Sequence, residues 1–211
     1  MTTSRQRYGI LLVTLLAAFV LQGVGADGHL ADVVITALLG ASIALALWTA
    51  DVARWAERLS IAVAVGLVVL STIDPDATAA KIGNVLLVAV GPPAVAIGVI
   101  RGMRRRGAVT IEAVLGVLCI YLLVGMFFAF LFAVVNQVGG APFFANGDPA
   151  NRPNFLYFSF TTLATVGYGD FTARSDLGHT LSILEALMGQ IYLVTVVSVL
   201  VGNLRPRRAG P

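Results

Sequence analysis

Six long stretches without a charged side chain constrain this chain more than any other feature of its sequence. A helix needs ~20 apolar residues to cross a hydrocarbon core of ~30 Å. Five of the stretches reach or nearly reach that length, and the third does so when its polar flanks are included. The stretches cover residues 8–26, 33–50, 59–73, 82–100, 113–135 and 186–204. The sequence therefore predicts an all-α membrane protein with six transmembrane helices.

The composition agrees with a membrane environment. Charged residues make up 12% of the chain and hydrophobic residues 58%, whereas about a quarter of the residues of a soluble domain are charged. Most of the surface is therefore expected to face lipid or other helices. The lone Cys119 lies inside an apolar stretch and permits no internal disulfide.

The distribution of arginines predicts the orientation. Six spans with both chain ends on one side place 11 of the 14 basic residues on that side. Positive residues concentrate in cytoplasmic loops, so both termini are expected in the cytoplasm and the protein in the plasma membrane. This explanation is favoured over nucleic-acid binding. Seven of these arginines are also candidates for contact with anionic lipid headgroups: Arg101, Arg104, Arg105, Arg106, Arg205, Arg207 and Arg208.

The first stretch has a second interpretation. Arg5 and Arg7, an apolar run and then Gly25-Ala26-Asp27 are also typical of a cleaved signal peptide. Because the run is longer than a usual signal core, a retained first span is favoured. Its removal would leave five spans in the same orientation, so topology does not decide between the two.

Two blocks are expected. Residues 1–107 hold four helices, and Gly91-Pro92-Pro93 should kink or break the fourth, either as plain structure or as a gating hinge. Residues 101–112 suit a short interfacial helix.

Residues 108–211 contain a span, a loop, a short apolar helix at 153–164, a second loop and the last span. Twelve residues cannot cross a bilayer, so this helix is predicted to be re-entrant.

After the short helix comes Thr165-Val166-Gly167-Tyr168-Gly169-Asp170. A cation that sheds its water needs oxygen ligands, and backbone carbonyls supply them without a fixed negative charge. Aiming successive carbonyls at one axis requires alternating ordinary and left-handed backbone conformations. Glycine adopts the left-handed region at low cost, and Gly167 and Gly169 stand at alternate positions.

This segment resembles the selectivity filter of potassium channels, and residues 109–204 resemble the pore of small prokaryotic channels with one pore loop per chain. The resemblance implies a homotetramer, no cofactor, and K⁺ as the permeant ion. It also implies that Val166 and Tyr168 point away from the ion. The ion sites would be formed by the carbonyls of Thr165, Val166, Gly167 and Tyr168 together with the Thr165 hydroxyl, with Gly169 completing the filter.

Further residues are expected to support or gate this filter. By resemblance, Asp170 anchors it and the aromatic Tyr157 and Phe158 surround the filter tyrosine. Glu185 is an intramembrane carboxylate, costly in hydrocarbon, and is expected to support the filter or the short helix rather than touch the ion. The remaining candidates for filter support are Thr161 and Thr162, and those for a hinge or gate are Gly189, Val197, Val201 and Leu204. For the last four, plain helix packing is the alternative.

Potassium-selective conduction is the favoured function, and a weakly selective monovalent cation channel is the alternative. A subunit of a potassium uptake transporter is less favoured, because such transporters resemble four pore repeats fused in one chain and only one repeat is present here. An enzyme is not expected, since His29 and His179 are isolated in outer loops. Voltage gating is not expected either, because residues 82–100 contain no arginine.

Overall fold

A computed structural model of the chain describes residues 2–25, 29–50, 54–73, 78–106 and 110–203. These residues form eight helices and no strand apart from an isolated bridge between Phe144 and Ala173. The helices are α1 (Thr2–Gly23), α2 (His29–Thr49), α3 (Arg54–Ile73), α4 (Thr78–Ala89), α5 (Gly91–Arg106), α6 (Ile111–Val138), α7 (Arg152–Leu163) and α8 (Asp176–Asn203). The all-α expectation is confirmed.

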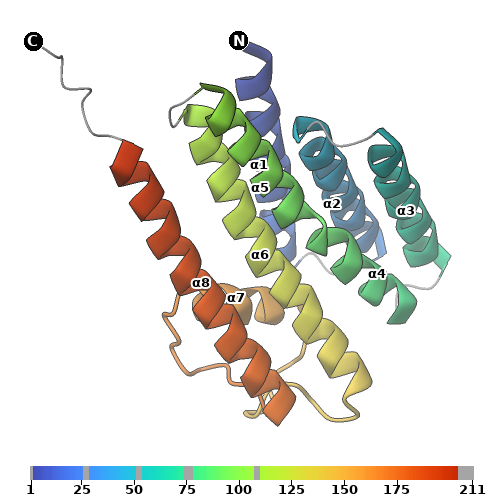
Figure 1. Cartoon of the computed structure of the whole chain (residues 1–211). Coiled ribbons are helices and arrows are strands. Elements are labelled where there is room, and N and C mark those ends of the chain that lie inside the picture. Colours follow the sequence, from blue (N-terminus) through green and yellow to red (C-terminus); the bar gives the residue numbers. More distant parts are fainter. Residues whose placement is uncertain (1, 26–28, 51–53, 74–77, 107–109, 204–211) are drawn as a thin grey trace, which may run out of the picture.

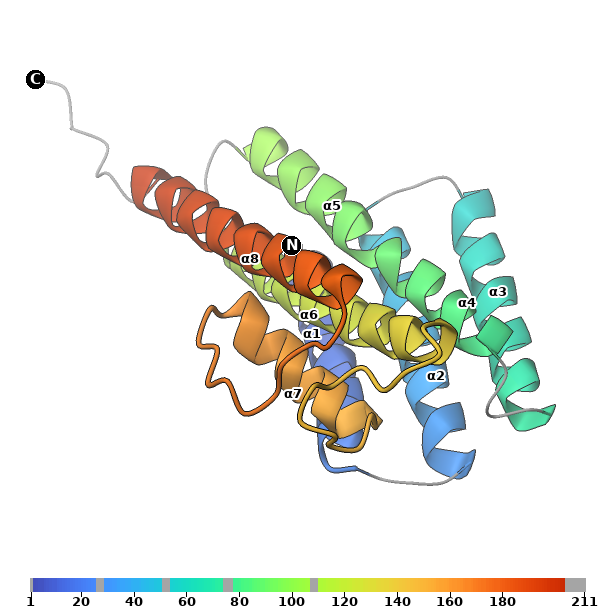
Figure 2. The same ribbon diagram turned by 90° about the horizontal axis from the view of Figure 1, so that it is seen from below.

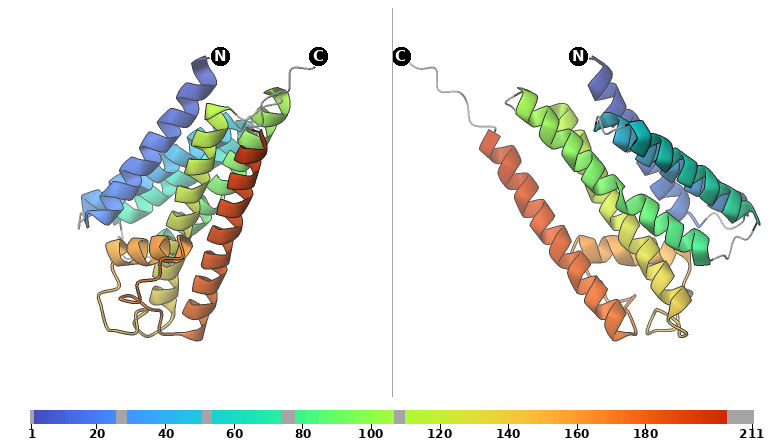
Figure 3. Two further views of the ribbon diagram at one scale, coloured as in Figure 1. Left: turned by 90° about the vertical axis from the view of Figure 1, so that its left-hand side faces the viewer. Right: turned by 45° about the vertical axis from the view of Figure 1, so that its right-hand side comes forward.

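The helices form a bundle with α6 at its centre. Helices α1, α4, α5, α7 and α8 all contact α6, whereas α3 contacts only α2 and α4 at the far edge of the bundle (Figure 1). The short helix α7 and its two loops lie at one end, next to the start of α8 (Figure 2). Helix α8 diverges from the other helices toward its C-terminal end (Figure 3). The start of α1 and the end of α8 lie at the same end of the molecule.

Five segments among the described residues are long and apolar enough to cross a membrane: Gln6–Gly23, Leu30–Thr49, Lys81–Arg104, Ile111–Val138 and Asp176–Val196. They agree with five of the six expected spans. The expected span at 59–73 forms part of α3 (Arg54–Ile73) and is not among these five segments. A count of six spans is therefore not confirmed.

The fourth expected span is broken where the sequence predicts it. Helix α4 ends at Ala89 and α5 begins at Gly91, and the Ala94 amide donates to the Val90 carbonyl across the junction (3.2 Å). Because α5 continues to Arg106, the expectation of a separate interfacial helix beginning at residue 101 is wrong. Arg101 instead donates to the carbonyl of Ala50, at the end of α2 (2.7 Å).

Three of the helices before α6, namely α1, α4 and α5, pack directly against it. Tyr8 of α1 lies where two glycines allow close approach: a Cβ at Gly98 would stand 2.6 Å from the Tyr8 hydroxyl, and one at Gly116 would stand 3.2 Å from its ring. One hydrophobic core therefore includes side chains from both sides of residue 107. The division of the chain at this residue remains a prediction.

Candidate functional site: a carbonyl-lined loop at the end of a short helix

The short helix α7 begins with two sequence features that fix its start. The side chain of Asn151 accepts a hydrogen bond from the Asn154 amide (3.0 Å), and Pro153 occupies the first turn, where a missing donor costs little. The helix ends at Leu163, one residue before the predicted end. The chain then enters the filter segment.

The backbone of the filter segment alternates in handedness. Thr165, Gly167 and Gly169 have φ values of +55°, +53° and +82°, so every second residue is left-handed. The sequence predicts left-handed conformations for the two glycines but not for Thr165. Among the described residues, Thr165 is the one non-glycine with a positive φ. Such a conformation costs a threonine about 1–3 kcal/mol and persists only where surrounding contacts impose it.

Those contacts come from the C-terminal end of α7. The amides of Val166 and Gly167 both donate to the Thr161 carbonyl (2.8 and 3.2 Å), and the Thr165 amide donates to the Thr162 carbonyl (2.9 Å). Thr161 and Thr162, predicted as filter supports, thus act through their backbone oxygens. The first three amides of the segment are thus bound to the helix end, which fixes the conformation of that part of the segment.

The carbonyl oxygens of the same segment are free for another ligand. Within the described part of the chain, no hydrogen bond reaches the carbonyls of Thr165, Val166, Gly167 or Tyr168. Backbone carbonyls at membrane depth are rarely left without a partner. A row of such oxygens beside the negative end of the α7 dipole is suited to cations.

Tyr157 and Asp170 hold the outer end of the loop. The Tyr157 hydroxyl donates to Asp170 Oδ2 (2.8 Å), and its ring stacks on Tyr168 at a centroid distance of 6.4 Å and an interplanar angle of 12°. The bond to Asp170 raises the pKa of Tyr157, so the hydroxyl remains a donor at neutral pH. Asn146 holds the same residue with a second hydrogen bond, because its side-chain amide donates to the backbone carbonyl of Asp170 (2.7 Å).

Within one chain, the Phe158 ring contacts the rings of other phenylalanines, and its predicted place around the filter tyrosine stays a prediction. Its ring packs on Phe132 of α6 and on Phe143 and Phe144 of the preceding loop, with centroid distances of 5.1 to 5.7 Å. Within the chain, its ring contacts are therefore with the cluster that anchors α7 to α6 rather than with Tyr168. Phe158 does line the cavity beside the filter, as described next.

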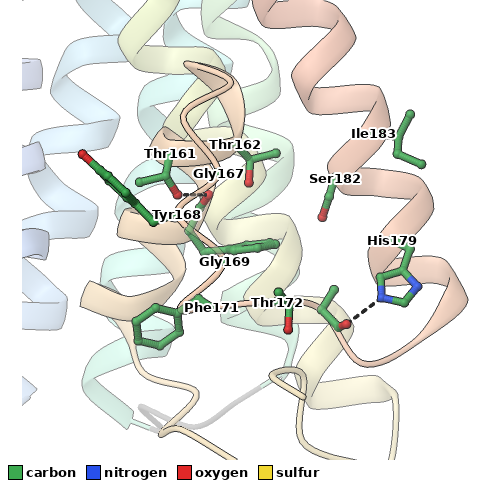
Figure 4. A pocket seen from close by; sticks show the side chains of 12 residues that line it. Thr161, Thr162, Gly167, Tyr168, Gly169, Phe171, Thr172, His179, Ser182 and Ile183 are labelled. Carbon is green, nitrogen blue, oxygen red and sulfur yellow. Dashed lines mark hydrogen bonds between the residues drawn. The ribbon is translucent and has the colours of Figure 1, made fainter. Parts of the chain in front are cut away.

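A cavity of about 410 Å³ lies between the filter loop and α8. Thr161, Gly167 and Tyr168 border it on one side, and Ser182 and Ile183 of α8 on the other (Figure 4). His179 lies at its edge with Nε2 bonded to the Ala173 carbonyl (2.7 Å). Since Val166 and Tyr168 are 51% and 71% exposed, the filter loop is open toward its surroundings in the isolated chain.

Glu185 and Gly189 bring α8 against the back of α7. Glu185 is fully buried, and its Oε1 lies 2.5 Å from the Ser159 hydroxyl of α7. A Cβ at Gly189 would stand 2.0 Å from the Leu163 carbonyl oxygen. Gly189 therefore lies at a close contact with the helix end that binds the filter amides.

The remaining gate and lipid candidates lie mostly outside what the structure describes. Val197 and Val201 belong to the last turns of α8, but nothing is described of their side chains, and Leu204, Arg205, Arg207 and Arg208 follow the described residues. Of the other lipid candidates, Arg101 and Arg104 are exposed near the end of α5, beside Arg105 and Arg106.

Sequence reasoning missed Ser159, Asn146 and the conformation of Thr165. Ser159 is one of several hydroxyl residues in α7, and only its buried position beside Glu185 distinguishes it. Asn146 lies in a loop rich in Gly, Pro and Asn, where no pattern marks one side chain. The alternate spacing of Gly167 and Gly169 was a usable sign for Thr165, since the same period reaches it two residues earlier.

A loop of unbonded carbonyls beside a short helix, within a bundle of apolar helices, is an arrangement suited to conducting cations across a membrane. Comparison with known proteins agrees: residues 131–205 match the family model described as "Ion channel". The chain is also 31% identical over 86 residues to the inward rectifier potassium channel Kirbac3.1 of Paramagnetospirillum magnetotacticum. The two matches support a potassium channel pore family for the C-terminal part of the chain.

The similarity to that relative is partial. The matched region covers 38% of this chain and 29% of the relative, so the chain spans less than a third of the relative's length in this match. No solved structure matches the chain significantly.

Proposed function

We propose that this protein is a potassium-selective channel subunit that conducts K⁺ passively through a pore made by four copies. The observation that carries the proposal is the filter segment, in which the amides of Thr165, Val166 and Gly167 are bound to the end of α7 while four successive carbonyls accept no hydrogen bond within the described chain. Such oxygens replace the hydration shell of a K⁺ ion. The Thr165 hydroxyl would complete the innermost site.

Several copies are required because one chain contributes one filter loop. The exposure of α8 supports this, since its apolar segment Asp176–Val196 is only 11% buried in the isolated chain. Ile183, Ile191 and Val194 are between 61% and 67% exposed. In the assembly these side chains would meet neighbouring copies, the pore or lipid.

The remaining features extend the proposal. Both termini would lie in the cytoplasm of a plasma-membrane protein, as the arginine distribution favours. Arginines at the ends of α5 and of the chain would contact anionic headgroups. The short helix α7 would enter the membrane from the outer side and return through the filter.

The experiment is a flux assay on purified protein in liposomes that contain a thallium-sensitive dye. Tl⁺ entry well above that of empty liposomes, with competition by K⁺ but not by Na⁺, is expected. Entry equal to that of empty liposomes would refute conduction. Equal competition by Na⁺ would support the weakly selective cation channel instead.

A further inference from the structure

A carboxyl group is buried where helices α6, α7 and α8 meet. Glu185 of α8 and Ser159 of α7 both have no exposed surface, and the carbonyl that completes the group belongs to Gly125 of α6. The missing side chain at Gly125 permits this approach, because a Cβ there would stand 2.5 Å from the Phe160 ring.

The distances among the Ser159 hydroxyl, the Glu185 carboxyl and the Gly125 carbonyl indicate which of these groups carries each proton. The Ser159 hydroxyl oxygen lies 2.7 Å from the Gly125 carbonyl oxygen and 2.5 Å from Glu185 Oε1. A serine hydroxyl has a single hydrogen to donate, and a backbone carbonyl can only accept. If Ser159 donates to Gly125, the hydrogen between Ser159 and Glu185 must come from the carboxyl group. An ionised Glu185 would leave one of the two close oxygen pairs without any hydrogen.

The surroundings offer an ionised carboxylate no compensation. Glu185 Oε2 has no hydrogen-bond partner in the structure. Among the described residues Glu185 has no ion-pair partner: Arg152, on α7, contacts Asp32 of α2 (3.0 Å) instead. Tyr121 of α6 interacts electrostatically with Glu185 and offers no positive charge. A buried carboxylate without a cation is far costlier than a neutral carboxylic acid.

We propose that Glu185 is a neutral carboxylic acid whose proton is donated to Ser159, which in turn donates to Gly125, so that a directional hydrogen-bond chain ties α8 and α7 to α6. Glu185 is thereby a positioning residue for the filter rather than a ligand of the ion. Ser159 stands two residues before Thr161, whose carbonyl accepts the Val166 and Gly167 amides. A shift of α7 at Ser159 is transmitted to the filter through those two bonds. This functional consequence rests on the proposed function, whereas the protonation of Glu185 does not.

Protonation can be measured directly. The chain has three glutamates, Glu57, Glu112 and Glu185. In the full-length protein labelled with ¹³C-glutamate and reconstituted in lipid, solid-state NMR should show one side-chain carboxyl at the shift of a neutral acid at neutral pH. That signal should disappear in Glu185→Gln and remain in the control Glu112→Gln. Three ionised carboxylates in the unmodified protein would overturn the proposal, whether or not the protein conducts and whether or not the variants fold.

The positioning role has its own readout. Glutamine retains a donor that can reach Ser159, so Glu185→Gln should keep the K⁺-over-Na⁺ permeability ratio of the parent. Glu185→Val has no donor and should lower the ratio by about tenfold, the effect expected of a lost buried hydrogen bond. An unchanged ratio in Glu185→Val would overturn the positioning role. Absence of any flux in the parent would instead contradict the proposed function and leave the NMR result standing.

Discussion

Thr165, Gly167 and Gly169 share left-handed backbone conformations, but the cost differs between them. Glycine adopts such a conformation freely, whereas an L-residue pays about 1–2 kcal/mol for it. In Thr165 the cost is opposed by the bond from its amide to the Thr162 carbonyl (2.9 Å). The residue that provides both a hydroxyl and a carbonyl to the proposed inner ion site is thus held in a strained conformation.

Replacing Gly167 with alanine tests the need for this conformation. No atom lies within 4 Å of a Cβ at Gly167, so the penalty is the backbone cost of its positive φ (+53°) rather than a steric clash. The Gly167→Ala protein is expected to fold and to insert into liposomes normally, and to lose most of its K⁺ flux. Unaltered flux would mean that the left-handed conformation is not required.

The matched control is Gly66→Ala in α3, where a Cβ likewise meets no atom within 4 Å but the residue is helical. Alanine there should stabilise the helix by ~0.5–1 kcal/mol and leave the flux unchanged. A loss of flux in the control would mean that the assay reports general damage.

At the scale of helices, α8 lies close to the end of α7 at Gly189. A Cβ there would stand 2.0 Å from the Leu163 carbonyl oxygen, and a backbone atom cannot move aside as a flexible side chain does. Gly189→Ala is therefore expected to displace α8 from α7 at a cost of ~1–3 kcal/mol, typical of overpacking. The measurement is K⁺ flux together with the thermal midpoint of the assembled protein, and both should fall.

Gly202→Ala provides the comparison within the same helix. No atom lies within 4 Å of a Cβ at Gly202, so neither quantity should change. If Gly189→Ala behaved like Gly202→Ala, the close contact would have no role in holding α7.

The helices and the filter segment could be predicted because their causes lie within single segments. The length of an apolar run decides whether a helix can cross a bilayer, and the glycine spacing in residues 165–169 is local. That α3 crosses the membrane stays a prediction. Glu185 was expected to support the filter or the short helix, but the identities of partners distant in sequence were not predictable: Ser159 and Glu185 are 26 residues apart, and Asn146 and Asp170 are 24 apart.

At the scale of the whole molecule, α1, α4 and α5 pack on α6. The span Lys81–Arg104 has its charges only at its ends, since residues 82–100 contain none. Voltage sensing needs several charges that move through the membrane field. A shallow relation between conductance and voltage is therefore expected.

Neutralising Arg101 and Arg104 together, as Arg101→Gln and Arg104→Gln, tests this expectation in planar bilayer recordings. Arg101 is bonded to the Ala50 carbonyl (2.7 Å) at the end of α2, which suits a structural tie. The steepness of the conductance–voltage curve should not change. A steep curve in the parent that flattens in the double variant would show that these arginines sense voltage.

The central claim concerns the carbonyl oxygens of Thr165, Val166, Gly167 and Tyr168, which accept no hydrogen bond within the described chain. The most direct measurement is the reversal potential of the purified full-length protein in a planar bilayer with K⁺ on one side and Na⁺ on the other. A reversal potential displaced strongly in the direction of K⁺ permeation is predicted, with the displacement lost in Gly167→Ala. A reversal potential near zero in the unmodified protein would contradict the account.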